Sequence, residues 1–180
     1  MDFNKFDSRA LAEAGALMTI LDANTGEPIT DNGKPCCVRV RGVASKSMQA
    51  KMRERQKAAM MKRSAKKKSK IKEDPEAQVM EDIHLQLVEG AAPYIIGFEN
   101  VERGGEPATA DDAEWFLDLT FPEMGMVTDD EGKPVMTETF EEDGTKSQTP
   151  SFEMKNNPFA KQVGEFASKQ ANFLAVDSEI

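Results

Sequence analysis

The feature that most constrains the fold of this chain is the segregation of its charge. Twelve of its 23 lysine and arginine residues, and a single acidic residue, lie within residues 45–72, which therefore carry a net charge of +11. The rest of the chain holds 11 basic and 31 acidic residues, a net charge of −20. Dense blocks of like charge stay in water, and blocks of opposite charge attract each other. We therefore expect residues 45–72 to lie outside the core and to face acidic protein surface, of this chain or of a neighbour.

Residues 46–72 predict a helix, because they hold strong helix formers and neither glycine nor proline. Its apolar face is thin, and lysines dominate beyond residue 62, where we expect the helix to fray. No aromatic residue interleaves to stack on bases, and the acidic remainder of the chain opposes nucleic acid. The sequence therefore favours docking on acidic protein over nucleic acid, with partner binding through the methionines of this segment as an alternative. The basic interaction face would comprise Lys51, Arg53, Arg55, Lys62, Arg63, Lys66, Lys67 and Lys68.

Residues 16–43 predict two strands around a turn region. Apolar and polar residues alternate there with the period of a half-buried strand, and Arg39 and Arg41 would share the opposite face. The two cysteines are adjacent, so on a strand they would point to opposite faces, which disfavours a disulfide between them. The inward-facing set is Met18, Ile20, Cys36, Val38 and Val40.

A triplet of glycine, a charged residue and proline occurs four times, at residues 26–28, 33–35, 105–107 and 132–134. Glycine supplies a positive φ angle, and proline prevents the turn from continuing as a helix. We interpret the triplets as shared hairpin chemistry and not as a sequence repeat. Only the stretches around 33–35 and 132–134 resemble each other further, and two copies are too few for a solenoid.

The remaining pattern predicts an α+β chain with a small N-terminal β-hairpin module and a mainly helical body. Helices are expected over residues 73–90, 109–119 and 156–174, and "PYIIGFENV" is expected to be a buried connector. Thr109 would cap the second helix and Asn157 the third. The third would carry one apolar stripe, made of Phe159, Val163, Phe166 and Phe173. The first of these helices would present Val79, Met80, Ile83, Leu87 and Val88 as its apolar face. The expected division is a hairpin module over 1–44, a basic helix or linker over 45–72, a helical body over 73–121, an acidic turn-rich insertion capable of forming a hairpin over 122–155, and a C-terminal helix and tail over 156–180.

Residues with catalytic or ligand chemistry are few. His84 is the only histidine and is expected to be a partly exposed helix residue. The chain has neither of the glycine-rich phosphate-binding motifs, and its acidic clusters at 129–132 and 141–144 lack the spacing of a calcium loop. The sequence therefore predicts no catalytic residue, no metal site and no cofactor. It also lacks an apolar run long enough for a membrane helix, and its start is not typical of a secretory signal.

Three stretches carry a resemblance to a known family. They are "LDANTGEPITDNGKPCCVRVRGVASK", followed by the charged helix, then "IIGFENVERGGEPATADDAEWFLDL", and finally "NPFAKQVGEFASKQANFLA". In this order they resemble the tail assembly chaperones of long-tailed, siphovirus-like bacteriophages and prophages. Residues 122–155 depart from the family pattern, in which the short helix leads directly to the last one.

The resemblance implies a non-enzymatic protein of the host cytoplasm that binds the phage tape measure protein and assists assembly of the tail tube. Its partners would be the tape measure protein, the tail tube protein and further copies of itself. The rival interpretation is a structural component of the tail or neck that remains in the virion. The residues that would present an apolar surface to a partner, or else form the protein's own core, are Met48, Met52, Met60, Ile83, Leu87, Trp115, Phe116 and Phe166.

Overall fold

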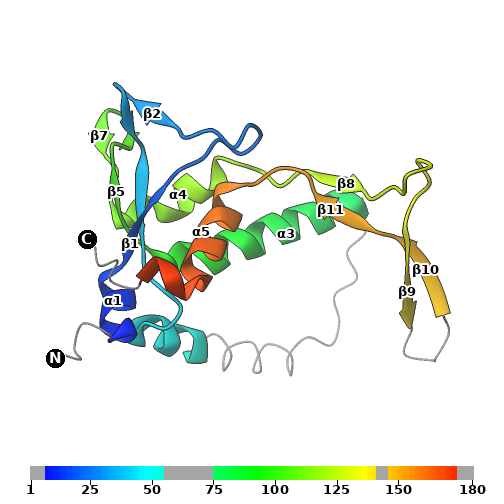
Figure 1. Cartoon of the computed structure of the whole chain (residues 1–180), viewed down its shortest axis with the longest axis horizontal. Helices are drawn as coiled ribbons and strands as arrows, with labels where there is room; N and C mark the ends of the chain where they lie inside the picture. The colour runs from blue at the N-terminus through cyan, green and yellow to red at the C-terminus, as the bar shows by residue number, and fades with distance from the viewer. Residues whose placement is uncertain (1–6, 55–74, 141–145, 174–180) are drawn as a thin grey trace, which may run out of the picture.

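The structure is a computed structural model that describes residues 7–54, 75–140 and 146–173 (Figure 1). It contains both helices and strands, in agreement with the predicted α+β class. The α-helices are α1 (Ser8–Ala14), a helix over residues 46–54, α3 (Pro75–Ala91), α4 (Ala113–Asp118) and α5 (Phe159–Ser168), and the short 3-10 turns are η2 (Ala92–Tyr94), η3 (Ala110–Asp112) and η4 (Gln170–Phe173). The strands are β1 (Ala16–Thr19), β2 (Thr30–Asp31), β3 (Lys34–Pro35), β4 (Cys37–Val40), β5 (Ile95–Glu99), β6 (Glu102–Arg103), β7 (Glu106–Pro107), β8 (Met124–Met126), β9 (Met136–Phe140), β10 (Lys146–Pro150) and β11 (Phe152–Met154).

A three-stranded antiparallel sheet, in the order β1-β4-β5, forms one layer of the body. Met18 pairs with Val38, and Val38 pairs with Phe98. The alternating apolar residues predicted to face inward are buried, whereas Arg39 and Arg41 lie on the wetter face and pair with Glu99 and Glu13. The predicted pairing of β1 with β4 and its inward face are therefore confirmed.

The third strand of this sheet corrects the prediction for "PYIIGFENV". Most of this segment is β5, which pairs along β4, and only its start forms η2. The segment is rich in β-branched and aromatic residues, which favour strands, but its pairing partner is some 60 residues earlier in the chain, as the partners Cys37 and Glu99 show. A local pattern does not reveal such a distant partner.

Helices α3, α4 and α5 cover the inner face of the sheet, and one apolar cluster joins them to it (Figure 1). Val88 of α3, Phe116 of α4 and Val163 of α5 meet Val38 and Val40 in this cluster. The strands of the N-terminal segment therefore share their core with the helices of the body. On α3 the buried stripe begins later than predicted: Val79 is exposed, and it is His84, Val88 and Ala91 that are buried.

Helix α5 begins with support from other parts of the chain. The sequence suggested Asn157 as its cap, but Thr120 fulfils that role, because its Oγ1 accepts a hydrogen bond from the backbone N–H of Phe159 at 2.8 Å. Gln162 is buried one turn later, and its side-chain amide bonds both backbone groups of Leu21 and the carbonyl of Asn157. The buried glutamine ties α5 to the loop after β1.

All four triplets close antiparallel pairs. At the 33–35 and 105–107 triplets, the glycine and the residue before it both have positive φ, and these pairs, Asn32-Gly33 and Gly104-Gly105, connect β2 to β3 and β6 to β7 as tight hairpin turns. The other two triplets close single bridges between Leu21 and Pro28 and between Thr128 and Pro134. In every case the proline is the residue that pairs across. The interpretation of the triplets as hairpin chemistry is confirmed.

The segment expected as an acidic insertion forms two consecutive ribbons that extend from the body (Figure 1). β8 pairs with β11, and further out β9 pairs with β10. Backbone bonds among Val127, Val135 and Ser151 join the two ribbons. We call residues 122–155, without the undescribed 141–145, the arm. The hairpin expectation was too simple, since four strands are present in the described part of this segment.

Both cysteines are free thiols, as their adjacency predicted, with Cys36 buried and Cys37 partly exposed. Within the described ranges, none of the helices combines the length and the apolar character that crossing a membrane requires.

Candidate functional site: an apolar groove beside α4

A groove of about 500 Å³ opens between the β2–β3 hairpin, the end of β5 and helix α4. Its floor is formed by core residues such as Phe116 and Phe159, and its walls are apolar side chains that reach the surface. Two acidic residues, Asp31 and Glu102, stand exposed at its edge. The lining residues are Ile20, Ile29, Thr30, Asp31, Cys36, Asn100, Val101, Glu102, Trp115, Phe116, Leu119 and Phe159.

The position of Trp115 in the wall is supported by a chain of polar contacts. The guanidinium of Arg103 lies 5.1 Å from the Trp115 ring centroid, a cation–π distance. Asp112 holds Arg103 through a 2.8 Å ion pair, and its carboxylate also accepts hydrogen bonds from the N–H and hydroxyl of Thr109. The N–H of Thr109 and the Arg103 guanidinium stabilise the carboxylate, so they lower the pKa of Asp112 below its usual value. Thr109 is the N-cap residue of η3, which leads into α4, as the sequence predicted.

This arrangement predicts a pH-dependent contribution of Asp112 to stability. Because its pKa is lowered in the folded state, the stabilisation is complete above the ordinary carboxyl pKa of about 3.9 and is lost as the pH falls through the folded-state pKa. We expect wild type to be more stable than Asp112→Asn in urea unfolding at neutral pH. The difference should shrink below about pH 4. A difference that is constant across this range would show that the carboxylate charge contributes nothing.

The structure divides the predicted partner-binding residues into three groups. Met48 and Phe116 are buried, as the core alternative predicted, although Phe116 also lines the groove. Trp115 is half-buried and lines the groove. The half-buried residues outside the groove are Ile83, Leu87 and Phe166, of which Leu87 and Phe166 pack against the core. Met52 is exposed on the helix over 46–54, and Met60 lies outside the described residues.

The basic interaction face is described only at its start. Lys51 and Arg53 are exposed, in agreement with a solvated helix. The remaining members of the predicted face, Arg55, Lys62, Arg63, Lys66, Lys67 and Lys68, lie outside the described residues.

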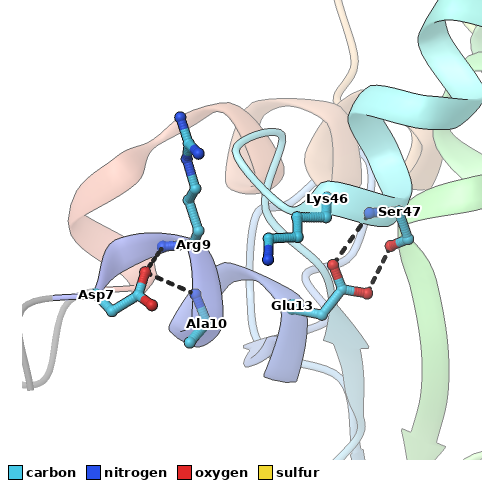
Figure 2. A pocket seen from close by; sticks show the side chains of 6 residues that line it. All are labelled: Asp7, Arg9, Ala10, Glu13, Lys46 and Ser47. Carbon is cyan, nitrogen blue, oxygen red and sulfur yellow. Dashed lines mark hydrogen bonds between the residues drawn. The ribbon is translucent and has the colours of Figure 1, made fainter. Parts of the chain in front are cut away.

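A second concavity, of about 570 Å³, lies where this basic helix meets α1 (Figure 2). Its two carboxylates serve as helix caps. Asp7 accepts from the N–H groups of Arg9 and Ala10, and Glu13 accepts from the N–H and hydroxyl of Ser47 at 3.1 and 2.6 Å. The two bonds from Ser47 lower the pKa of Glu13, and the charge of Arg41 adds to this. This concavity is therefore a structural joint that fixes the first turn of the basic helix to α1.

Three apolar residues of the groove were not singled out in the sequence: Ile29, Val101 and Leu119. Ile29 directly follows a Gly-Glu-Pro triplet, and Leu119 follows the last polar residue of α4. In both cases an apolar residue occupies a turn or a helix end, where a polar residue is usual. This unusual placement is the feature of the sequence from which an exposed apolar site could have been predicted. Val101 carried no such signal, because its role depends on the position of β5.

The one histidine is buried, not partly exposed as predicted. Its Nε2 lies 2.7 Å from Oδ1 of Asp118, its ring is tilted by 39° against that of Phe121 with centroids 4.7 Å apart, and its buried Nδ1 has no hydrogen-bond partner among the described residues. Only Nε2 of the ring is therefore engaged by a carboxylate. Burial raises the pKa of the Cys36 thiol in the groove, which keeps it protonated at neutral pH. Among the described residues, no group of three or more histidine, cysteine or acidic side chains could hold a metal ion.

Comparisons of this chain with known protein families, with curated proteins and with solved structures give no match.

Proposed function

We propose that this chain is a non-enzymatic tail assembly chaperone whose groove holds the apolar face of a helical partner, the phage tape measure protein, in the host cytoplasm, and that it assists assembly of the tail tube. The observation that carries the proposal is the groove itself: apolar walls that reach the surface, with carboxylates at the rim. A tryptophan in the wall supports it further, because tryptophan is enriched among residues that dominate binding energy.

The chemistry of the lining favours a helix over a small molecule as the occupant. The volume alone does not decide, since small-ligand pockets span about 300–1,000 Å³. Leu119 is 55% exposed, however, so the apolar wall continues onto the open surface. An amphipathic helix offers apolar side chains every three to four residues, and lysines or arginines at its flanks would meet Asp31 and Glu102. In this proposal the N-terminal module supplies Ile29 and the helical body supplies Trp115 and Leu119.

The absence of an enzymatic role is part of the proposal and rests on the groove's contents. Cys36 is its only thiol and is held protonated by burial. His84 is not among the lining residues and is committed to Asp118. The described lining of the groove therefore offers neither a histidine nor a thiol with a lowered pKa.

The test is co-expression with the tape measure protein that we propose as the partner. Wild type is expected to keep that protein soluble and to co-purify with it at moderate salt. Leu119→Glu should lower recovery of the complex at least about tenfold, because it buries a charge in the apolar contact. The matched control is Leu17→Glu, at a residue that is 42% exposed and whose side chain, one position from Met18, points to the opposite face of β1.

Two results would contradict the proposal. One is equal recovery of the complex with Leu119→Glu and with Leu17→Glu. The other is no association, with this chain present stoichiometrically in purified virions, which would establish the structural tail or neck component. The arm favours that second candidate, since it extends into solvent where a neighbouring subunit could contact it.

A further inference from the structure

The outer ribbon of the arm, β9 with β10, is exposed to solvent wherever its side chains are described. The two strands pair with each other over five residue pairs. A two-stranded ribbon with water on both faces is marginally stable at best. We therefore expect contact with another protein surface to stabilise this ribbon.

One face of the arm presents exposed apolar side chains in a row. Met126 and Phe152 stand directly opposite each other across the β8–β11 ribbon, and Met136 pairs with Pro150 at the base of the next ribbon. Pro150 and Phe152 are two residues apart, so the alternation of side chains along a strand places the two pairs on the same face. We call Met126, Met136 and Phe152 the arm patch.

The surroundings of the arm patch are acidic. The described residues of the arm comprise six acidic and three basic residues, a net charge of −3. Two of the three lysines are engaged within the arm: Lys133 pairs with Glu131, and Lys146 pairs with Glu138. An apolar patch in this setting favours a partner that is itself basic around an apolar centre.

The helix over residues 46–54 has that complementary chemistry. Lys46, Lys51 and Arg53 are exposed on it, and exposed Met52 lies between two of them in sequence. Ser45 caps this helix by accepting from the N–H of Met48, and Glu13 binds Ser47 (Figure 2), so its start is held rigidly on the body. The helix and the arm lie at opposite ends of the molecule (Figure 1), so within one copy they do not meet.

We propose that the occupant of the arm patch is a second copy of this chain, with the arm of one copy docked on the basic helix over 46–54 of the next. Met52 packs against Met126 and Phe152, while Lys51 and Arg53 face the acidic residues of the arm. The two surfaces differ and lie at opposite ends, so the contact is head-to-tail and repeats from copy to copy. Neither surface includes the groove, so this assembly stands independently of the proposed partner binding.

The first test is the size of the full chain by sedimentation and light scattering. In about 50 mM salt we expect species larger than a dimer that grow with concentration. In about 500 mM salt, where charges at this spacing are screened, association should weaken at least about tenfold. A chain that stays monomeric at low salt and high concentration overturns the proposal.

The second test separates head-to-tail contact from the alternatives. The helix variant carries Lys51→Gln, Met52→Ser and Arg53→Gln, and the arm variant carries Met126→Ser and Phe152→Ser. Each is expected to be monomeric alone, and an equimolar mixture should stop at a 1:1 dimer, because only one intact junction remains. Formation of that dimer also shows that both variants are folded.

Other outcomes identify other contacts and overturn this one. Self-association of the helix variant alone would indicate an arm-to-arm contact, and self-association of the arm variant alone a helix-to-helix contact. Leu119→Glu is the control that leaves self-association unchanged, and the helix and arm variants should still co-purify with the tape measure protein. The experiments therefore distinguish failure of the self-association proposal from failure of the proposal that the groove binds a partner.

Discussion

Replacement of Phe116 by alanine is expected to destabilise the fold by about 3–5 kcal/mol, the range for loss of a buried aromatic side chain. Phe116 is 3% exposed and lies at the centre of the cluster that joins sheet and helices. Its ring stacks on Phe159 of α5, with centroids 4.7 Å apart, and meets Phe98 of β5 edge-on at 5.1 Å. Alanine would remove both aromatic contacts and leave a cavity where α4, α5 and β5 converge.

The control for this prediction is Phe152→Ala in the arm. Phe152 is 56% exposed, so its replacement should change the free energy of unfolding by no more than about 0.5 kcal/mol. Both variants are compared with wild type by urea unfolding in about 0.5 M salt, which screens association between copies. Equal effects of the two substitutions would show that the core is not centred on Phe116.

The elements that the sequence predicted correctly are those whose signals are local. The alternation around Val38, the capping threonine before α4 and the glycine-proline triplets each act within a few residues. The stripe predicted for the last helix, Phe159, Val163, Phe166 and Phe173, faces the core: three of these residues are buried, and Phe166 is half-buried against the core. Short-range periodicity and turn chemistry are sufficient to specify such elements.

The errors share a physical cause, which is dependence on partners distant in sequence. β5 is a strand because β4 pairs with it, and the start of the helix that carries buried Met48 is tied to Glu13 of α1, more than 30 residues earlier. His84 was expected to be partly exposed, yet the segment after α4 covers it through Asp118 and Phe121. The same limit applies to the groove, where Ile29, Val101 and Leu119 come from three separate segments. Trp115 was the one member of its wall that residue type alone suggested.

The largest effect from a nearly isosteric substitution is expected at Gln162, where Gln162→Glu should cost about 3–5 kcal/mol at neutral pH, the penalty of an uncompensated buried charge. The Gln162 amide donates to the carbonyls of Leu21 and Asn157, both at 2.8 Å, and its oxygen accepts from the N–H of Leu21 at 3.1 Å. Glutamate would keep the accepted bond, lose both donated bonds and point a negative charge at two carbonyl oxygens. Gln170→Glu, at an exposed position, is the control and should change stability by no more than about 0.5 kcal/mol.

The pH dependence of the Gln162→Glu deficit identifies its cause. Burial beside two carbonyls would raise the pKa of the new carboxyl above its unfolded value of about 4.3, since only the protonated form can donate. The deficit relative to wild type should therefore be smallest below about pH 4, grow as the pH rises through the unfolded pKa, and level off above the folded pKa. Urea unfolding of both proteins across this range measures it. A deficit of the same size at every pH would mean that geometry, not charge, makes glutamine necessary here, and no deficit would mean that the link between α5 and the loop after β1 does not hold the fold together.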